Sequence, residues 1–370
     1  MVDTVVAGHL CLDIFPDLSA HAEGQFDASF QPGRLVQVGP AVFSTGGAVS
    51  NTGLVLHRLG IETRLLAKVG ADQFGQSICE IIANQLPSLV DGIRASPETS
   101  TSYSIVISPP GNDRRFLHHP GANDNFCADD VKDQDLGNAR LFHFGYPPLM
   151  ARMFADDGLE LTRLFQRVKG LGLTTSLDMA YPDPASPAGK ADWDHILRNT
   201  LPFVDIFLPS LDEILFMLGR KSGILLTGEL LSEVSSQLLD MGAKIVVLKL
   251  GELGLYLRTA SKDVLEDLGF ASPSDLTIWG DFEAWYPCFQ VKVAGTTGSG
   301  DATIAGFLAA FLRDLPPARA LTAALAVGAC CVEAADGLSG IRSWDDTWQR
   351  INAGWARRPD FERIPRKNNE

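Results

Sequence analysis

The amino-acid sequence predicts an α/β fold, a three-layer sandwich in which helices cover both faces of a mainly parallel sheet, with a small β lid added. Short apolar runs alternate with amphipathic helical patterns along most of the 370 residues, which is typical of parallel sheets with helical crossovers. Segments 26–45 and 98–119 break this alternation, and the second alternates with period two, as half-exposed strands do. We therefore place lid segments at about 12–45 and 98–120.

The predicted elements follow in chain order. Core strands are expected at 4–9, 64–70, 139–145, 173–179, 204–209 and 243–251. A helix is expected over 301–315, because apolar residues recur there on one stripe and Pro316 and Pro317 follow. The next helix should cover about 318–335. The aromatic residues of 258–287 favour a hairpin pinned to the body over a flap that stacks on a ligand ring.

Charge and cysteine content exclude several classes of function. The formal net charge is −14 at pH 7, and Lys and Arg do not cluster, which argues against a nucleic-acid partner. The longest uncharged apolar run, 320–332, is too short to span a bilayer, and no basic signal-peptide region opens the chain. Six cysteines without CxxC spacing are expected to be buried thiols in a reducing cytoplasm. We expect a soluble, cytoplasmic protein, with one domain at 1–350 and a charged, frayed tail at 351–370.

The stretch VAGTTGSGDATIAGF, residues 293–307, indicates a phosphate site. Gly298 and Gly300 allow a tight turn, so that main-chain amides at the start of the helix converge on one anion, which the helix dipole also favours. Asp301 stands where a Walker A loop has lysine. It is suited to accept the proton of an attacking hydroxyl, and the helix N-terminus should keep it ionised at neutral pH. The GD pair by itself favours the simpler role of a helix N-cap.

The longer string GTTGSGDATIAGF resembles the C-terminal signature of the ribokinase-like sugar kinases, also called the phosphofructokinase-B family. STGGAVSNTGLVLHRLG at 44–60 resembles the N-terminal signature, and the likeness spans roughly residues 4–345. It implies a ribokinase-like fold, with Asp301 as the catalytic base and the amides of Gly298, Ser299, Gly300 and Asp301 as an anion hole. ATP and Mg²⁺ are implied as well, and a need for K⁺ stays open. Ser299 and Gly295 are mild departures from the usual signature.

The resemblance also implies a sugar site. Gly46 and Gly47 allow close backbone approach to a ligand, Asn51 offers a donor and an acceptor to vicinal hydroxyls, and Asp13 accepts two hydroxyl donors. Each has a simpler explanation as a tight turn, an exposed helix residue or a loop cap. Arg115 in the lid is expected either to touch an anionic substrate group or to be an ordinary surface arginine.

The nucleotide side is assigned in the same way. VVLKLGELG, 246–254, resembles the segment beside the nucleotide, with Lys249 reaching a phosphate; a surface lysine is the alternative. The further nucleotide residues are expected to be Gly251, Gly254, Thr297, Gly328 and Cys331. Small residues at 328 and 331 also suit close helix packing.

The metal site is assigned to one carboxylate. Glu213, in LPSLDEI, lines up with the family's NxxE element and is expected to hold Mg²⁺ through water. Ser210 replaces the asparagine of that element. Ser210 and Glu213 also fit a helix capping box, and both roles can hold together.

The sequence therefore predicts an ATP-dependent phosphotransferase acting on a hydroxyl of a sugar or sugar-like polyol. The alternatives are a nucleoside kinase of the same fold and a non-catalytic sugar-sensing protein. A dinucleotide oxidoreductase is disfavoured, because no GxGxxG follows the first strand. Exposed lid edges also predict a homodimer through the lid.

Overall fold

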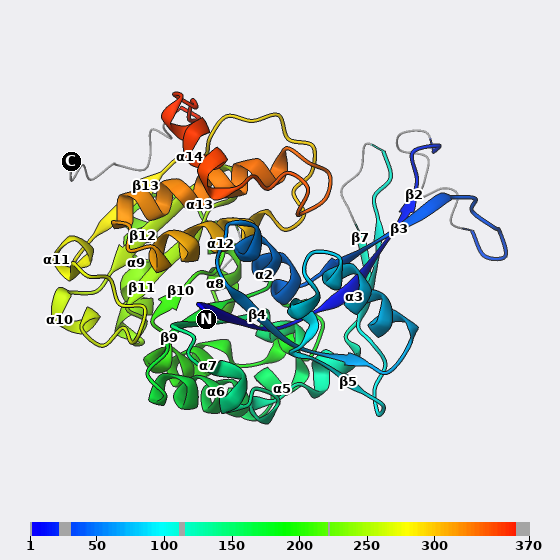
Figure 1. The fold of residues 1–370 in the computed structure, drawn as a ribbon, viewed down its shortest axis with the longest axis horizontal. Coiled ribbons are helices and arrows are strands. Elements are labelled where there is room, and N and C mark those ends of the chain that lie inside the picture. Colours follow the sequence, from blue (N-terminus) through cyan, green and yellow to red (C-terminus); the bar gives the residue numbers. More distant parts are fainter. Residues whose placement is uncertain (1, 22–30, 111–114, 221–222, 360–370) are drawn as a thin grey trace.

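The computed structural model describes residues 2–21, 31–110, 115–220 and 223–359, and these form two sheets (Figure 1). The larger sheet has nine strands in the order β13-β12-β11-β10-β9-β8-β1-β4-β5. Its strands are β1 Thr4–Gly8, β4 Thr63–Gly70, β5 Ile93–Ser96, β8 Leu141–Gly145, β9 Thr174–Asp178, β10 Ile206–Phe207, β11 Ile245–Lys249, β12 Leu255–Thr259 and β13 Glu283–Tyr286.

This sheet confirms the α/β class. Neighbours from β5 to β11 are parallel, and only β12 and β13 pair antiparallel with their neighbours. All six predicted core strands belong to it. The three strands that sequence reasoning did not assign, β5, β12 and β13, lie at the ends of the sheet, where four or five residues suffice to continue the pairing.

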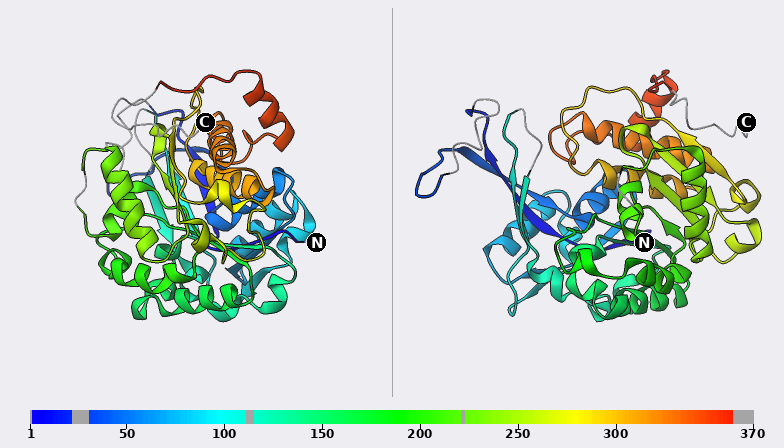
Figure 2. Two further views of the ribbon diagram at one scale, coloured as in Figure 1. Left: turned by 90° about the vertical axis from the view of Figure 1, so that its left-hand side faces the viewer. Right: turned by 180° about the vertical axis from the view of Figure 1, so that it is seen from behind.

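Helices cover both faces of the sheet (Figure 2). One face carries α2 Ala48–Arg58, α3 Gln73–Ala83, α12 Ser299–Leu312 and α13 Pro317–Val332; the other carries α6 Leu159–Gly170, α7 Trp193–Thr200, α8 Leu211–Met217 and α9 Gly228–Asp240. Shorter helices are α4 Asp133–Leu136, α5 Ala151–Phe154, α10 Lys262–Leu265 and α11 Leu276–Trp279, and α14 covers Trp344–Asn352. The alternation within β1 separates the two cores, since Val6 packs in one and Val5 and Ala7 in the other.

The central helix α12 is more buried than its sequence pattern predicted. It begins at Ser299, and every residue from Ile304 to Leu312 is buried, not one stripe alone. The reason is its position against both α13 and α2, which cover the surfaces that an amphipathic helix leaves to water. Asp301 therefore enters the interior of the domain.

The second sheet, which we call the lid sheet, projects from one end of the body in Figure 1. Its strands are β2 Cys11–Asp17, β3 Gly39–Gly46, β6 Tyr103–Ile107 and β7 Arg115–His119, in the order β3-β2-β6-β7. Three of them, β3, β6 and β7, come from the two segments that broke the α/β alternation, and β2 falls in the wider lid range predicted at about 12–45. Residues 22–30 and 111–114 of the predicted lid ranges lie outside the described residues, and 31–38 form no strand.

The aromatic segment and the tail both pack on the body. Trp279 is buried, with its ring centroid 5.3 Å from that of Phe311 in α12, so the pinned arrangement is the observed one. The tail was predicted to begin at 351 and to fray, but α14 ends at Asn352. Trp355 stacks on Phe289 at 4.5 Å, so the expected fraying is wrong for this part of the tail. Residues 360–370 lie outside the described residues.

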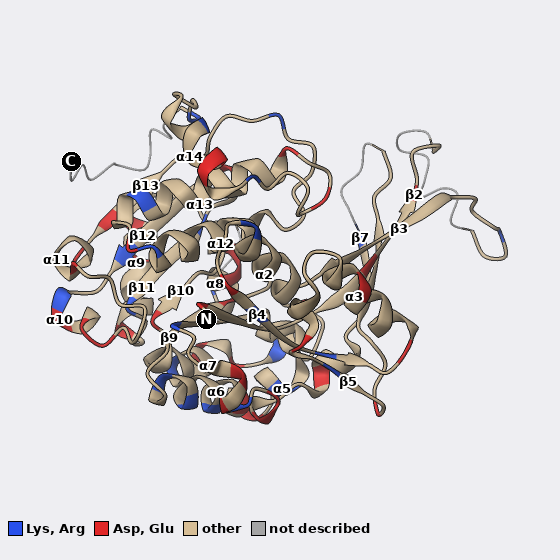
Figure 3. Ribbon diagram, viewed as in Figure 1, with Lys and Arg blue, Asp and Glu red and all other residues tan. Residues whose placement is uncertain are grey.

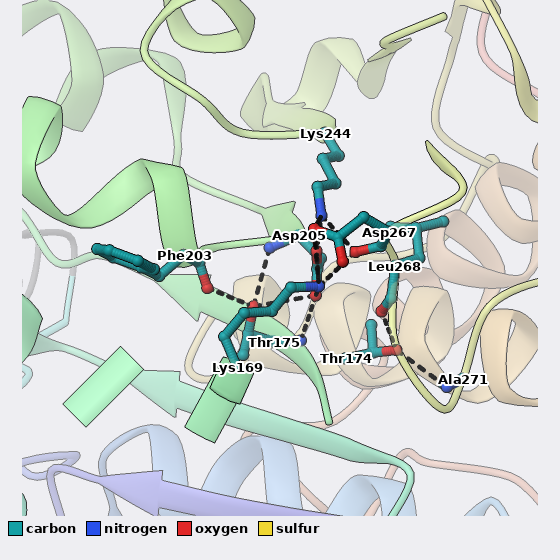
Figure 4. Close-up of polar contacts among 9 residues, drawn as sticks. All are labelled: Lys169, Thr174, Thr175, Phe203, Asp205, Lys244, Asp267, Leu268 and Ala271. Carbon is teal, nitrogen blue, oxygen red and sulfur yellow. Dashed lines mark hydrogen bonds and ion pairs between the residues drawn. The ribbon is translucent and has the colours of Figure 1, made fainter. Parts of the chain in front are cut away.

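A buried ion cluster closes the amino-terminal edge of the sheet (Figure 4). Asp205, just before β10, accepts hydrogen bonds from the Nζ atoms of Lys169 and Lys244, both at 2.8 Å, and from the amide of Thr175 at 2.9 Å. Its side chain is 1% exposed. This cluster is structural, because it lies at the opposite end of the strands from the polar residues described below.

The distribution of charged and apolar residues agrees with what the sequence predicts, whereas the burial of the cysteines agrees only for some of them. Acidic and basic residues are interspersed along the ribbon (Figure 3). Within the described residues, no helix has the length and apolarity to cross a bilayer. All six cysteines are free thiols, but only Cys11, Cys330 and Cys331 are buried, so the expected burial is wrong for the other three.

Candidate active site

The candidate active site lies at the carboxyl ends of the parallel strands. Tyr146 directly follows β8, Asp178 ends β9, and Lys249 ends β11. These ends meet at one edge of the sheet, where ligands of α/β folds generally bind. The first turn of α12 brings Asp301 to the same place. The Tyr146 hydroxyl donates a hydrogen bond to Asp301, although the two residues are 155 positions apart in the sequence.

Asp301 is held by three side chains. Its carboxylate accepts hydrogen bonds from Asn51 Nδ2 at 3.0 Å, Thr52 Oγ1 at 3.4 Å and the Tyr146 hydroxyl at 2.8 and 2.9 Å. The residue is 2% exposed and forms no salt bridge with a described residue. The N-cap of α12 is Gly298, so the alternative that Asp301 caps the helix is wrong. Its three donors hold the carboxylate in one orientation.

Tyr146 holds this position at a conformational cost. Its φ of 68° lies in the left-handed region, which residues with a side chain seldom occupy. Such backbone strain persists where the surrounding structure overrides it, and it is frequent at functional sites. Sequence reasoning did not find Tyr146, although its place directly after a buried strand was a usable signal.

Burial and the neighbouring groups have opposite effects on the pKa of Asp301. Burial raises its pKa above the ordinary value, while Lys249 and the three hydrogen-bond donors act to lower it. The expectation that the helix N-terminus would decide its charge is therefore incomplete, because burial is the largest effect. A raised pKa brings a carboxylate closer to the basicity that a general base needs.

Two further carboxyl groups share this buried site with one cation. Lys249 Nζ lies 2.6 Å from Asp178 Oδ1, and Glu213 also acts on Lys249. Burial raises the pKa of Asp178 to about 8, and burial likewise raises the pKa of Glu213. The surrounding carboxylates raise the pKa of Lys249 against its burial, so its ammonium stays charged. Lys249 is thus a buried ion-pair partner, and the alternative of a surface lysine is wrong.

The glycine loop has the geometry of an anion site. Gly298 has a φ of 68°, and α12 starts at the next residue, which leaves amides of the first turn without an intrahelical acceptor. One of the four expected amides is occupied, because Ser299 donates to the Thr296 carbonyl at 3.3 Å. A Cβ added to Gly300 would lie 3.8 Å from Lys249 Nζ, so the ammonium is directly beside the loop.

Two of the five predicted sugar residues, Asp13 and Asn51, line a cavity of about 240 Å³, whereas Gly46, Gly47 and Arg115 do not. Asp13, Asn51 and Thr297 line it, together with residues of the lid sheet, α2, α3 and the loop 336–339. A Cβ on Gly46 would lie 2.2 Å from Asp13 Oδ2, so glycine makes room for this carboxylate. Asn51 connects the cavity wall to Asp301, which is itself not among the lining residues.

Glycine is required at position 47 for a different structural reason than at position 46. Its φ is 91°, and it is the N-cap of α2. A Cβ there would lie 2.5 Å from the carbonyl oxygen of His9, so no other residue fits without displacement.

The other predicted binding residues do not line this cavity. Arg115 is exposed on β7 and does not line this cavity. Gly251 and Gly254 form the positive-φ turn between β11 and β12. Gly328 permits close packing, because its Cβ would lie 2.2 Å from Thr303 Oγ1 of α12. Cys331 donates to the Thr297 carbonyl at 3.4 Å, and burial raises its pKa to about 12.

Glu213 is engaged in the capping box that its sequence allowed. Its Oε2 accepts the Ser210 amide at 2.7 Å, and Ser210 Oγ accepts the Glu213 amide at 3.3 Å. Within the described ranges, no group of three or more His, Cys, Asp or Glu side chains is placed to hold a metal. Mg²⁺ retains several waters and often needs only one or two carboxylates together with substrate phosphates, so this arrangement still fits it.

Comparison with known proteins finds a matching family profile, related sequences and a shared fold. The sequence profile of the pfkB family of carbohydrate kinases matches residues 5–342. An uncharacterized sugar kinase of Archaeoglobus fulgidus is 29% identical over 261 residues, 70% of this chain and 86% of that protein. A 2-dehydro-3-deoxygluconokinase of Bacillus subtilis is 25% identical over 312 residues, which are 81% of this chain and 85% of that protein. The fold is shared with Arabidopsis thaliana ribokinase in complex with ribose and ATP, with a TM-score of 0.72 and 19% identity. The match covers 94% of this chain and 98% of that chain.

Proposed function

The chain belongs to the pfkB family of carbohydrate kinases, and from this premise we propose that it transfers the terminal phosphate of ATP to a hydroxyl of a sugar or sugar-like polyol. Sugar kinases are phosphotransferases with an alcohol group as acceptor. The observation that carries the proposal is the buried Asp301 carboxylate at the first turn of α12. Asn51, which lines the cavity, donates a hydrogen bond to it.

The proposed reaction places the acceptor beside Asn51, with the reacting hydroxyl directed at Asp301. The hydroxyl oxygen forms a bond to the terminal phosphorus of ATP, the bond from that phosphorus to the bridging oxygen breaks, and ADP leaves. Asp301 accepts the hydroxyl proton late in this displacement, since phosphoryl transfer is largely dissociative in most analyses. Asp13 and Asn51 would orient the sugar by hydrogen bonds, a positioning that lowers the entropic part of the barrier.

The loop and its lysine would stabilise the phosphates. The free amides of the α12 first turn and the dipole of this helix favour negative charge there. Lys249 would contribute its ammonium beside Gly300 while Asp178 holds it in place. Thr297, Gly328 and Cys331 lie next to the same turn and are proposed as neighbours of the nucleotide.

Mg²⁺ bound with ATP would neutralise phosphate charge during the transfer. Glu213 would hold it through water, with Asp178 as a second carboxylate, whose Oδ2 is buried without a hydrogen-bond partner in the described chain. The six free thiols suit a reducing compartment, in agreement with the proposed cytoplasmic location.

A coupled ADP-release screen tests the proposed function. We expect turnover with one or more members of a panel of sugars, sugar acids, inositols and nucleosides, at saturating ATP and Mg²⁺. Turnover of nucleosides alone would favour the nucleoside kinase. Phe15 is the one aromatic residue lining the cavity within the described chain, which leaves little surface for stacking a base. No turnover with any acceptor, together with sugar binding, would favour the sugar-sensing protein.

We also propose that two copies pair through the lid sheet. Val42 and Phe43 on β3, and Phe116 and Leu117 on β7, are between 52% and 63% exposed. These two strands are the edges of the lid sheet, and exposed apolar edges tend to pair. Analytical ultracentrifugation at micromolar protein should show a dimer that Phe43→Lys dissociates. A wild-type monomer would refute this arrangement.

A further inference from the structure

The imidazole of His9 is buried beside the candidate active site without a partner for its ring nitrogens. His9 directly follows β1 and is 2% exposed. Among the residues that the structure describes, neither Nδ1 nor Nε2 has a hydrogen-bond partner. A buried polar group normally has a hydrogen-bond partner, because leaving it unpaired is unfavourable. An unpaired ring at this position therefore points to a ligand.

His9 lies next to residues of both the body and the lid sheet. Its ring centroid is 6.1 Å from that of Tyr146, whose hydroxyl is bonded to both Asp301 oxygens. It is 5.4 Å from the ring of His118 on β7. His118 is exposed, and its Nδ1 is paired with Ser104 Oγ at 3.0 Å. A movement of the lid sheet that displaces His118 would uncover His9.

The charge state of His9 restricts the chemistry that it can recognise. Burial and the neighbouring His118 lower its pKa to about 3, so the ring is neutral at physiological pH. A neutral imidazole has one N–H donor and one nitrogen acceptor. A hydroxyl group, which also donates and accepts, can form a hydrogen bond with either nitrogen.

The charges around this part of the site disfavour an anionic acceptor. Asp13 on β2 lines the cavity, and Asp301 is linked to the cavity wall through its hydrogen bond from Asn51. Lys249 is paired with Asp178, and Arg58, which lines the cavity, donates to a main-chain carbonyl and to a glutamine side chain. A carboxylate brought here would add negative charge beside Asp13 and Asp301, whose ionised forms burial already makes unfavourable.

We propose that His9 is a specificity-determining residue of the acceptor site, and that it binds a hydroxyl of a neutral sugar or polyol in preference to a sugar acid. The proposal rests on the proposed kinase function. A hydroxyl of the acceptor bonds one of the ring nitrogens that the free protein leaves unpaired, once His118 has moved with the lid sheet. Removing these nitrogens should weaken acceptor binding and leave ATP binding unchanged.

Two variants of the full chain separate the hydrogen bonds of His9 from its shape. His9→Phe retains a planar ring without nitrogens, and His9→Gln retains a donor and an acceptor. With the neutral acceptor that the wild type turns over, at saturating ATP and Mg²⁺, His9→Phe should raise the acceptor KM about tenfold or more. His9→Gln should restore part of that loss, and the KM for ATP should stay within about twofold. If His9→Phe does not fold, as judged by its melting curve, the KM of His9→Gln must still rise.

The charge argument is tested by acceptor pairs of one carbon skeleton. The wild type should prefer a neutral sugar to its aldonic acid by about tenfold or more in kcat/KM. Equal or better use of the acid, or an unchanged acceptor KM in His9→Phe, would overturn this inference while the proposed function stands. Absence of wild-type turnover with every acceptor would overturn the proposed function itself, and this inference with it.

Discussion

Replacing Asp301 by asparagine removes the proposed base with minimal change in volume. Asp301 is the one site residue that touches Asn51, Thr52 and Tyr146 together. The amide of the variant cannot take up the hydroxyl proton at neutral pH. We therefore expect the chemical step to slow while the acceptor still binds at the cavity.

The magnitude follows from the role of the group. Loss of a positioned general base costs about 10²–10⁴ in rate, which corresponds to about 3–5 kcal/mol in the activation barrier. The effect on stability should be smaller. The variant retains one carbonyl oxygen, which can still accept the hydrogen bond of the Tyr146 hydroxyl. Its NH₂ group replaces the second oxygen, so one donor in the site loses its acceptor, which costs about 1–3 kcal/mol of stability. Relief from burying a charge offsets part of that cost.

Steady-state ADP release and urea unfolding, measured on the same preparations, separate the two effects. Asp301→Asn should lower kcat at least a hundredfold, with a small change in the free energy of unfolding. Asp205→Asn is the matched control, because Asp205 is equally buried but lies at the other end of the strands. It should unfold more easily and retain the wild-type kcat in its folded fraction. A kcat for Asp301→Asn within tenfold of wild type would refute the assignment of the base.

Three further predictions follow from single contacts. Tyr146→Phe removes a donor to the ionised form of Asp301, so the acid limb of the kcat/KM profile should move to higher pH; an unchanged pH profile would contradict the contact. Gly46→Ala places a methyl group where the Asp13 carboxylate lies, and should raise the acceptor KM about tenfold without changing the KM for ATP, as initial-rate kinetics would show. Asp205→Ala removes the buried carboxylate that Lys169 and Lys244 share and leaves them, among the described carboxylates, only the exposed Asp267, so it should lower the free energy of unfolding by about 3–5 kcal/mol in urea titrations. A loss below about 1 kcal/mol would show that Asp267 and water compensate these lysines.

The acid limb of the wild-type pH profile has a defined direction. Because burial raises the pKa of Asp301, the base becomes protonated, and kcat/KM falls, as the pH drops through a value above the ordinary aspartate pKa of about 3.9. The cluster of Asp178, Glu213 and Lys249 titrates as a unit with it, so the profile reports the whole group.

Residues within continuous patterns were predictable. The core strands stand out as apolar runs of fixed length, and the glycine loop places Asp301 at a helix start by local geometry alone. Asp13 and Asn51 were found because they belong to the same short motifs, and the structure places both on one cavity wall. The short edge strands and the packing of the tail were not found, because pairing and packing with distant residues hold them in place.

The sequence by itself determined the fold class, the loop and the carboxylate that the loop presents, because each depends on backbone conformation within a few neighbouring residues. The tertiary structure alone decided the partners of that carboxylate. Tyr146, Asp178 and His9 follow or end separate strands, a position that suggests a site but does not show which residues meet Asp301 there. They meet only because parallel strands in this order bring their carboxyl ends to one edge, under the first turn of a buried helix.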